Sequence, residues 1–396
     1  MPATIPPAGR PAGERALGGV RVVFPAALGP VPFAAMLLAD LGAEVVRIDR
    51  AGAAGVIDTA LADDPRTRGQ RSIGIDLKHP RGRAVAVRLA ASADVLLEGM
   101  RPGVMERLGL GPADLHAVNP GLVYGRATGW GQDGPLAQTV GHDINYIARS
   151  GALHPIGDPD RPPAVPLNLV ADFGGGGAYL ALGVLAALVQ RGRTGRGQVV
   201  DAAMVDGAAS LTTMIHGMLG SGAWRPERGA NLLDGSAPFY RAYRTADDRY
   251  VAVGAIEPPF YRALLDGLEL DPDDWPQHDR SRWAAQRTAL AEIFASRTRA
   301  EWGKRFHGTD ACVTAVSTPD EAAADPELAA RGVFVDWDGL RQPAPAPRLS
   351  ASPPVARPRC GQAADTAEIL AELGLGRDEA DELRAARAVF AAPALP

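Results

Sequence analysis

The sequence predicts an α/β protein in two parts: a large domain on a Rossmann-like parallel sheet and a smaller α+β domain. Its 396 residues are too many for one small core and suit two domains. In the first half, short apolar runs alternate with helical patterns, which favours parallel strands joined by helices. After Trp224 the pattern changes to a hairpin followed by helices, so we expect a second domain there.

The first half opens with a strand, a helix and a second strand. The runs "GVRVVF" (19–24) and "EVVRID" (44–49) are apolar and β-branched, and "FAAMLLADLGA" between them has a helical period that ends at a glycine. The remaining strands are expected at "SIGIDL", "DVLLEG", "LVYGRAT" and "GQVVDAAM", with helices at "HPRGRAVAVRLAASA", "RPGVMERLGLG", "PADLHAVNP" and from Asn168 to Gln190. No GxGxxG motif follows the first strand, so a nicotinamide or flavin site is not supported.

The second part begins with "FYRAYRTADDRYVAVGAI", a predicted antiparallel hairpin whose turn is "TADD". Helices are expected at "PPFYRALLDGL", "WAAQRTALAEIFAS" and "AEWGKRF", and "RQPAPAPRLSASPPVARPR" (341–359) reads as an extended linker before a helical tail. We therefore expect a disordered leader at 1–18, the large domain at 19–224 and the small α+β domain at 225–335. Residues 336–396 form the proline-rich linker and helices that return to the large domain.

Composition narrows the class of protein. Hydrophobic residues make up 46% of the chain and charged residues 22%, as in soluble globular proteins, and the net charge of −5 argues against a nucleic-acid binder. The two cysteines and seven histidines show no metal-ligand spacing, so no metal site is expected. The start lacks an apolar signal region, and the longest apolar run, "AYLALGVLAALV", is too short to span a bilayer. We expect a cytoplasmic protein without a membrane partner.

Two stretches carry candidate proton-transfer groups. In "GHDINY" (141–146), His142 precedes a predicted helix, whose dipole would favour the neutral imidazole of a general base, and Asp143 is the expected N-cap. In "PLNLVADFGGGG", Asp172 lies four residues after Asn168, so the two would share a helix face. The alternatives are a structural histidine near a turn and a capping aspartate. The glycines permit close approach of a ligand or of a packed helix.

Cations lie near the ends of several predicted strands. Six are arginines (Arg47, Arg50, Arg68, Arg71, Arg101 and Arg107), and Lys78 is one of only two lysines in the chain. The carboxyl ends of parallel strands are where an open α/β sheet binds ligands, and arginine binds phosphates bidentately. The pattern predicts a ligand with several phosphates, unless the arginines are simply a solvated rim.

The motifs resemble a known family over most of the chain. "LLADLGAEVVRID", "DLKHPRGRAVAVRLAASADVLLEGMRPGVMERLGLG", "RATGWGQDGP", "GRGQVVDAAMVDGAAS" and "LAELGLGRDEADELRA" resemble the family III CoA-transferase superfamily. "GHDINY", "PLNLVADFGGG", "NLLDGSAPFYRAYRTADDRYVAVGAIEPPFY" and "GTDACVTAV" look like its α-methylacyl-CoA racemase branch. The resemblance implies an interlocked obligate homodimer and no cofactor beyond coenzyme A in the substrate. Each active site would lie between the large domain of one chain and the small domain of the other.

The resemblance also implies roles for particular residues. His142 and Asp172 would be the acid/base pair on either side of the substrate α-carbon, with Glu257 orienting the histidine and Asn168 the aspartate. Contacts with coenzyme A would come from Arg50, Ile75, Asp76, Leu77, Lys78, Gly99, Met100, Arg101, Arg107, Gly141, Asp143, Ile144, Asn145 and Tyr146. The first loop, "PAALGPVP", is poorer in glycine than the family pattern, and Met100 stands in place of an aromatic residue.

Inversion of a carbon requires one base on each face, because a single base returns the proton to the side from which it came. The thioester carbonyl acidifies the α-hydrogen, and backbone N–H groups near Asp143 would stabilise the enolate-like oxygen. The main prediction is therefore a racemase for 2-methyl-branched acyl-CoA thioesters. The alternatives are a CoA-transferase, in which Asp172 is the nucleophile that forms an acyl-enzyme intermediate, and an acyl-CoA-binding protein with a degenerate site.

Overall fold

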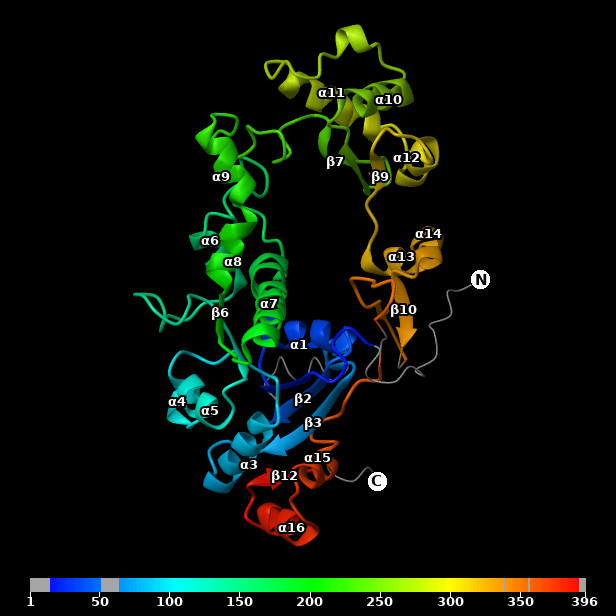
Figure 1. Cartoon of the computed structure of the whole chain (residues 1–396). Coiled ribbons are helices and arrows are strands. Elements are labelled where there is room, and N and C mark those ends of the chain that lie inside the picture. The colour runs from blue at the N-terminus through cyan, green and yellow to red at the C-terminus, as the bar shows by residue number, and fades with distance from the viewer. Residues whose placement is uncertain (1–14, 51–63, 338, 355–356, 392–396) are drawn as a thin grey trace. The chain divides into compact units, whose positions relative to one another are not determined.

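The computed structural model describes residues 15–50, 64–337, 339–354 and 357–391. The chain forms two compact units, described separately below (Figure 1). The large unit comprises residues 1–150, 167–211 and 325–396, and the small unit comprises 151–166 and 212–324. The boundaries expected from the sequence differ, since 151–166 and 212–224 belong to the small unit and 325–335 to the large one. One reason is Arg228, whose guanidinium donates to the carbonyls of His154, Asp158 and Arg161.

Part of the expected leader is ordered. Residues 1–14 lie outside the described residues, but 15–19 form a turn in which the Leu17 N–H donates to the Leu41 carbonyl at 3.1 Å. The prediction of a disordered leader is therefore wrong for residues 15–18, because this turn closes onto the end of the first helix.

The large unit alternates strands and helices. Its elements are β1 (Arg21–Pro25), α1 (Pro30–Asp40), β2 (Glu44–Asp49), η2 (Pro65–Thr67), β3 (Gln70–Ile75), α3 (Pro80–Ala91), β4 (Val95–Glu98), α4 (Val104–Arg107), α5 (Pro112–Val118), β5 (Val123–Thr128), α6 (Asp143–Arg149), η3 (Leu169–Ala178), α7 (Tyr179–Thr194), β6 (Val199–Ala203), α8 (Met204–Leu211), α14 (Pro326–Arg331), β10 (Phe334–Trp337), β11 (Leu340–Pro343), α15 (Thr366–Glu372), α16 (Arg377–Ala385) and β12 (Val389–Phe390).

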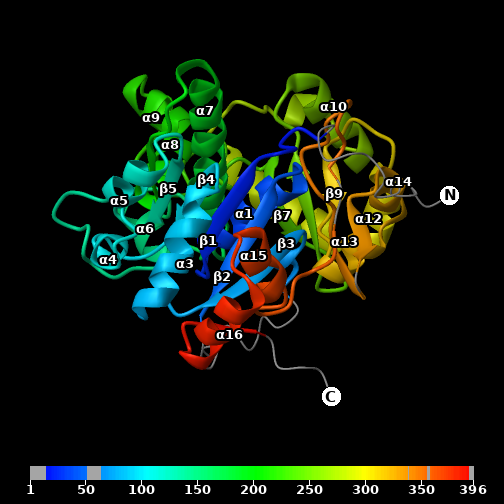
Figure 2. The same cartoon turned by 60° about the horizontal axis from the view of Figure 1, so that its bottom comes forward.

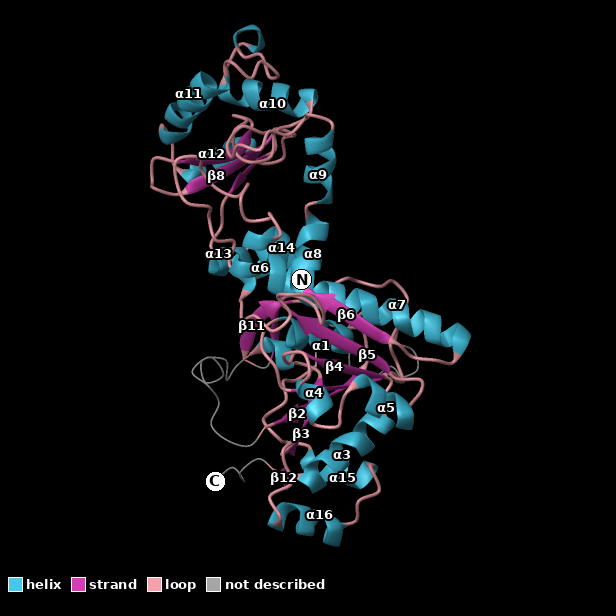
Figure 3. Ribbon diagram, turned by 90° about the vertical axis from the view of Figure 1, so that its left-hand side faces the viewer, coloured by secondary structure: helices cyan, strands magenta, loops and turns pink. Residues whose placement is uncertain are grey.

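Seven strands form the main sheet in the order β12-β3-β2-β1-β4-β5-β6, drawn in magenta in Figure 3. Strands β1 to β6 are parallel, and β12 pairs antiparallel with β3 at one edge. The sheet confirms the Rossmann-like prediction. Its strand order reverses between β1 and β4, and ligands of open α/β sheets bind outside the carboxyl ends of the strands at such a point.

Alternating side chains of the strands enter two cores. On one face, Val23, Val46 and Ile48 belong to a cluster with residues of α3, α5, α15 and α16. On the other face, Val22 and Phe24 belong to a cluster with residues of α1 and α7. Strands buried on both faces explain why the sequence shows continuous apolar runs rather than an apolar–polar alternation.

The C-terminal tail completes the sheet edge, with β12 and α15 beside β3 in Figure 1 and α15 again near β3 in Figure 2. The sequence predicts a wholly helical tail, but Val389 pairs with Ile75 as a strand. The proline-rich linker also departs from prediction at its start, because β11 pairs antiparallel with β10. The pairing of β12 has no signal in the sequence, because its partner β3 lies far away along the chain. β10 and β11 do have one, since the two residues "DG" between them are typical of a hairpin and the prediction missed them.

η3 and α7 form one continuous helical stretch, Leu169–Thr194, that is π-helical at its start. By length and composition it is the one described helix that could cross a membrane, although 39% of its most apolar window is buried inside the unit. The prediction that no apolar segment is long enough to span a bilayer is therefore wrong for this helix. Its length alone identifies no membrane protein, because buried core helices have the same composition.

The small unit is built on a three-stranded antiparallel sheet in the order β7-β8-β9. Its elements are α9 (Thr213–Gly220), β7 (Tyr240–Arg244), β8 (Tyr250–Gly254), α10 (Pro258–Leu268), η4 (Pro272–Asp274), α11 (Trp283–Ala295), α12 (Arg299–Phe306), β9 (Val313–Ala315) and α13 (Pro319–Ala324). The predicted hairpin and three predicted helices are present. Aromatic rings fill the core, with Phe294 stacked on Tyr243 and edge-on to Trp302.

Candidate active site

His142 immediately precedes α6, the short helix that follows the loop after β5. Its backbone is extended, with φ −130° and ψ 175°, which is the conformation of an N-cap residue. The His142 N–H donates to Asn145 Oδ1 at 3.0 Å, and the Asn145 N–H donates to the His142 carbonyl at 2.8 Å. The His142 imidazole is exposed at the large unit's surface, so it is free to meet a ligand.

Asp143 does not cap its own helix, so that prediction is wrong. The residue is buried, and its Oδ2 accepts hydrogen bonds from the backbone N–H groups of Ala171 at 2.8 Å and Asp172 at 2.7 Å. These N–H groups lie in the first turn of η3, where a helix offers no internal acceptor. Asp143 therefore caps the neighbouring helix, on which the second candidate acid/base residue lies.

Asp172 and Asn168 make the contact that their spacing predicts. Asn168 Nδ2 donates to Asp172 Oδ2 at 3.2 Å. Burial raises the pKa of the Asp172 carboxyl above its usual range, while the hydrogen bond from Asn168 opposes this rise. The negative charge of Asp143 raises the pKa further, and the charges of His142 and Arg66 lower it. The candidate carboxyl and imidazole thus lie within electrostatic range of each other.

Gly29 is a site residue that sequence reasoning missed. It is the N-cap of α1, with φ 64° and ψ −118°, a conformation that side chains with a Cβ rarely adopt. A Cβ at this position would lie 3.2 Å from Asp172 Oδ2. The single glycine in "PAALGPVP" therefore stands directly against the candidate carboxyl. The sequence signal for this role was the position of Gly29, directly before the first helix that follows a parallel strand.

The glycines after Asp172 allow close packing of helices, which was one of the two roles expected for them; the other was close approach of a ligand. A Cβ on Gly175 would lie 2.6 Å from the Ala208 nitrogen in α8, and one on Gly177 would lie 2.8 Å from the Pro30 carbonyl in α1. Backbone therefore meets backbone on both sides of this stretch. The glycines fix Asp172 between two helices of the large unit.

A cavity of about 160 Å³ opens at the carboxyl ends of β1, β4 and β5. It lies at the point where the strand order reverses, as the fold predicts. The predicted coenzyme A residues that line it are Gly99, Met100, Arg101, Gly141 and Tyr146. Leu28 and Pro30, the neighbours of Gly29, also line it, so the cavity adjoins the Asp172 carboxyl.

Tyr146 connects the cavity wall to His142. Its hydroxyl donates to the Gly141 carbonyl, and its ring lies edge-on to Trp130 with centroids 4.9 Å apart. A Cβ on Gly129 would lie 2.2 Å from this ring and one on Gly141 2.7 Å. The chain at Gly129 and at Gly141 can therefore approach the ring only because these residues have no side chain. The hydrogen bond to the Gly141 carbonyl holds the peptide before His142 in place.

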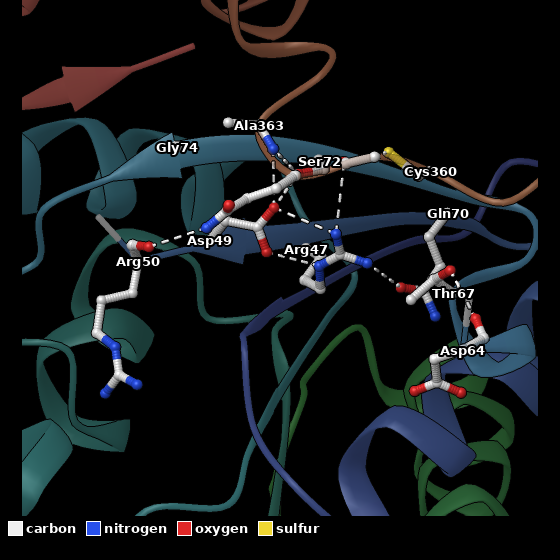
Figure 4. Close-up of polar contacts among 12 residues, drawn as sticks. Arg47, Asp49, Arg50, Asp64, Thr67, Gln70, Ser72, Gly74, Cys360 and Ala363 are labelled. Carbon is white, nitrogen blue, oxygen red and sulfur yellow. Dashed lines mark hydrogen bonds and ion pairs between the residues drawn. The ribbon is translucent and has the colours of Figure 1, made fainter. Parts of the chain in front are cut away.

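The other predicted coenzyme A residues lie outside this cavity. Ile75 is buried in the core, whereas Lys78 is exposed beyond the end of β3 with Asp76 and Leu77 between them. Ile144 and Asn145 are exposed on α6, and Arg50 follows the end of β2 with its guanidinium directed away from Asp49 (Figure 4). Arg107 folds back over Gly103, where its Nη1 would lie 3.1 Å from a Cβ.

Glu257 belongs to the small unit, where it is the N-cap of α10. Its predicted role in orienting His142 stays a prediction. Within the described ranges, no three His, Cys, Asp or Glu side chains gather as metal ligands would.

Three of the arginines expected at the ligand edge are engaged in ion pairs instead. Arg47 lies within β2 and pairs with Asp49 at 2.6 Å, in the network of Figure 4. Arg68 is buried against Asp40 at 2.6 Å, and Arg71 lies near the amino end of β3, where Glu44 and Glu372 hold it. For these positions the prediction of phosphate contacts is wrong, because their charges are already matched by carboxylates of the fold.

A buried ion network supports the loop that lines the cavity. Glu98, at the end of β4, is fully buried and accepts from the Met100 N–H at 2.7 Å and from Arg126 Nε at 2.7 Å. Arg126 also pairs with Glu106 of α4 at 2.8 Å. The network ties β4, β5 and α4 together around residues 99–101. The arginine in the otherwise apolar run "LVYGRAT" was the sequence signal for it.

Comparison with known proteins places the chain in a family. Residues 17–363 match CoA-transferase family III. The chain is 47% identical to the α-methylacyl-CoA racemases of Mus musculus, over 94% of this chain and 97% of the relative, and of Homo sapiens, over 93% and 96%. It is 32% identical to the succinyl-CoA–D-citramalate CoA-transferase of Chloroflexus aurantiacus, over 95% and 98%.

Solved structures support the same placement. The crystal structure of Rv3272 from M. tuberculosis has a TM-score of 0.74 and 29% identity and covers 89% of this chain and 98% of its own. That of a CAIB/BAIF family protein from Brucella suis has a TM-score of 0.74 and 27% identity, with coverage of 91% and 99%. With its cavity at the sheet's carboxyl edge and its match over most of its length, the chain belongs to CoA-transferase family III.

Proposed function

We propose that the protein is an α-methylacyl-CoA racemase, which interconverts (R)- and (S)-2-methyl-branched acyl-CoA thioesters by 1,1-proton transfer. The similarity to two racemases over nearly the whole chain supports this reading. The observation that carries it is the pairing of an exposed imidazole, His142, with a partly buried carboxyl of raised pKa, Asp172. The two lie on elements tied together by Asp143, beside the cavity.

The reaction needs opposite protonation states in the two groups. One group removes the α-proton and leaves an enolate, while the other delivers a proton to the opposite face of the same carbon. Free histidine and aspartate have pKa values near 6.5 and 3.9, so a protonated Asp172 is scarce unless its surroundings raise its pKa. Burial does so, and brings the acid closer to the range in which it exchanges protons with His142.

The substrate contacts follow from the cavity. The acyl-CoA thioester would lie against Gly99, Met100 and Arg101, with its carbonyl oxygen near the backbone N–H of Asp143 at the start of α6. Arg50, Lys78 and Arg107 are further cations that we assign to the phosphates of coenzyme A. Both proton transfers use side chains of the protein, so we propose no cofactor beyond the coenzyme A of the substrate and no metal.

We further propose an obligate homodimer. Large apolar side chains are exposed along η3 and α7, with Leu169 at 55%, Leu182 at 62% and Val189 at 59% exposure. A second copy of the chain would cover them, and would also supply Glu257 from its small unit to His142. A folded, active monomer in analytical ultracentrifugation would contradict this. A cytoplasmic location stays a prediction.

Deuterium exchange separates the racemase from the CoA-transferase alternative. With each enantiomer of a 2-methylacyl-CoA in deuterated water, the wild-type protein should incorporate α-deuterium and invert the centre. His142→Ala should invert neither enantiomer but still exchange one of them, with retention, through Asp172; Asp172→Ala should exchange the other through His142. A matched control is His116→Ala in α5, which removes a ring that contacts the Leu122 carbonyl and should leave activity unchanged.

A transferase would give a different result. Asp172→Ala would then abolish all turnover, His142→Ala would have a mild effect, and hydroxylamine would trap an acyl group on Asp172. Robust inversion by His142→Ala would refute the two-base assignment.

A further inference from the structure

A single carboxylate joins the two proposed acid/base residues. Asp143 follows His142 in the chain, and its Oδ2 accepts the N–H groups of both Ala171 and Asp172, at 2.8 and 2.7 Å. We propose that Asp143 is a positioning residue, whose buried side chain sets the separation of His142 and Asp172 across the substrate α-carbon. The inference rests on the proposed racemase function and deepens it.

The bridge is short and leaves little freedom. His142 and Asp143 share a peptide bond, and the carboxylate binds the N–H of Asp172 itself, so few rotatable bonds separate the two backbones. Hydrogen bonds to a charged acceptor are shorter and stronger than neutral ones. Rotation of α6 against η3 would break both bonds at once. A two-base reaction depends on this distance, because each group must reach one face of the same carbon.

The second oxygen of Asp143 indicates more than a structural role. Oδ1 is buried and accepts no hydrogen bond within the described part of the chain. A buried acceptor without a donor destabilises a fold, so its presence calls for another explanation. Replacement by a neutral cap would avoid part of this cost. The charge is instead kept next to Asp172.

The groups that face Asp172 explain what this charge does. The Asp143 carboxylate raises the pKa of Asp172, whereas His142, which precedes α6, and Arg66 of η2 lower it. Burial raises the pKa of Tyr146, also on α6, and Asp172 and Asp143 lie close enough for their charges to raise it further, while its hydroxyl donates to the Gly141 carbonyl. Of these groups around Asp172, Asp143 is the negative one. It keeps Asp172 able to hold a proton beside a cationic histidine.

A second aspartate of the chain provides a matched control. Asp325 is the N-cap of its own helix, α14, and likewise accepts two successive N–H groups on one oxygen, those of Glu327 at 2.8 Å and Leu328 at 2.9 Å. It lies outside the candidate active site. Any effect that follows merely from weakening a helix cap should appear in Asp325→Asn as well as in Asp143→Asn.

The experiment compares Asp143→Ala, Asp143→Asn and Asp325→Asn with the wild-type protein, after wild-type racemisation has been measured. Asp143→Ala should lower kcat by about 100-fold, the scale for a misplacement near 1 Å. KM for 2-methylacyl-CoA should stay within about threefold, because the Asp143 side chain does not line the cavity. Asp143→Asn keeps an acceptor for both N–H groups and should recover at least about tenfold of the lost kcat.

The pH profile separates positioning from stability. Asp143→Asn removes the negative charge that raises the pKa of Asp172, so the acidic limb of the pH profile of kcat should move to lower pH. Asp325→Asn should leave this limb in place. The proposal is overturned if Asp143→Ala keeps kcat within about threefold, or if its KM rises while kcat holds. It is also overturned if folded Asp143→Asn keeps the wild-type acidic limb. Absence of racemisation by the wild type would instead refute the proposed function.

Discussion

Gly29→Ala tests the environment of the Asp172 carboxyl with the smallest possible change. Gly29 has φ 64° and ψ −118° at the start of α1, and a methyl group there would lie 3.2 Å from Asp172 Oδ2. The substitution therefore has two separate effects. It strains the backbone, and it pushes the carboxylate away from its present position.

The size of each effect follows from the structure. A non-glycine residue in such a conformation costs about 1–3 kcal/mol of folding free energy, which lowers Tm by roughly 2–10 °C for a domain of this size. A contact of 3.2 Å is shorter than an ordinary carbon–oxygen van der Waals distance, so the carboxylate must move by tenths of an ångström. Since a 1 Å misplacement costs about 100-fold, we expect kcat to fall by about tenfold.

The assay measures Tm by thermal unfolding, and kcat and KM for racemisation of a 2-methylacyl-CoA. The control is Gly195→Ala, at the end of α7, where φ is 69° but no atom lies within 4 Å of the added methyl group. It should lower Tm and leave kcat unchanged. Wild-type kcat in Gly29→Ala, or an equal loss of kcat in Gly195→Ala, would refute the reasoning.

Three further predictions follow from the site. Arg101→Ala should raise KM for acyl-CoA by about tenfold with little change in kcat. Arg107→Ala should raise KM less, because of these two arginines only Arg101 lines the cavity. If steady-state kinetics gave the larger rise in KM for Arg107→Ala, Arg107 and not Arg101 would be the main coenzyme A contact. Glu98→Ala should destabilise the fold by about 3 kcal/mol in urea unfolding, since it leaves Arg126 short of a buried partner, and should raise KM by freeing the Met100 N–H. An unchanged unfolding midpoint would show that Glu98 contributes nothing. A carboxyl whose pKa is raised on folding favours the folded state only while it is protonated, and this contribution is lost as pH rises through the folded pKa. Asp172→Asn should therefore raise Tm at neutral pH, and this gain in Tm should shrink as pH falls toward about 4. A gain independent of pH would contradict the raised pKa of Asp172.

The parallel sheet could be predicted because each strand is buried on both faces and each helix has a clear apolar period. The strand "EVVRID" matches β2 residue for residue, and "PPFYRALLDGL" matches α10. β12 could not be predicted, because two residues carry no periodicity and their pairing with β3 joins segments more than three hundred residues apart.

The candidate site divides in the same way. The Asn168–Asp172 contact depends on helical spacing alone, so the sequence sufficed. The role of Asp143 depends on N–H groups of another element, and Arg68 depends on Asp40 in α1, so local patterns pointed to the wrong partners. Residue type suggested the chemistry, but only the fold shows which charges are already paired.

The network in Figure 4 has a consequence for synthesis of the chain. Asp49 and Ser72 bind the Ala363 N–H, and Thr366 binds the Gly74 N–H, so strands made early are completed by residues made last. Until residues 360–390 leave the ribosome, the outer side of β3 is an open edge that can pair with any exposed strand. The nascent large unit therefore remains vulnerable to aggregation while residues 212–324 of the small unit are being made.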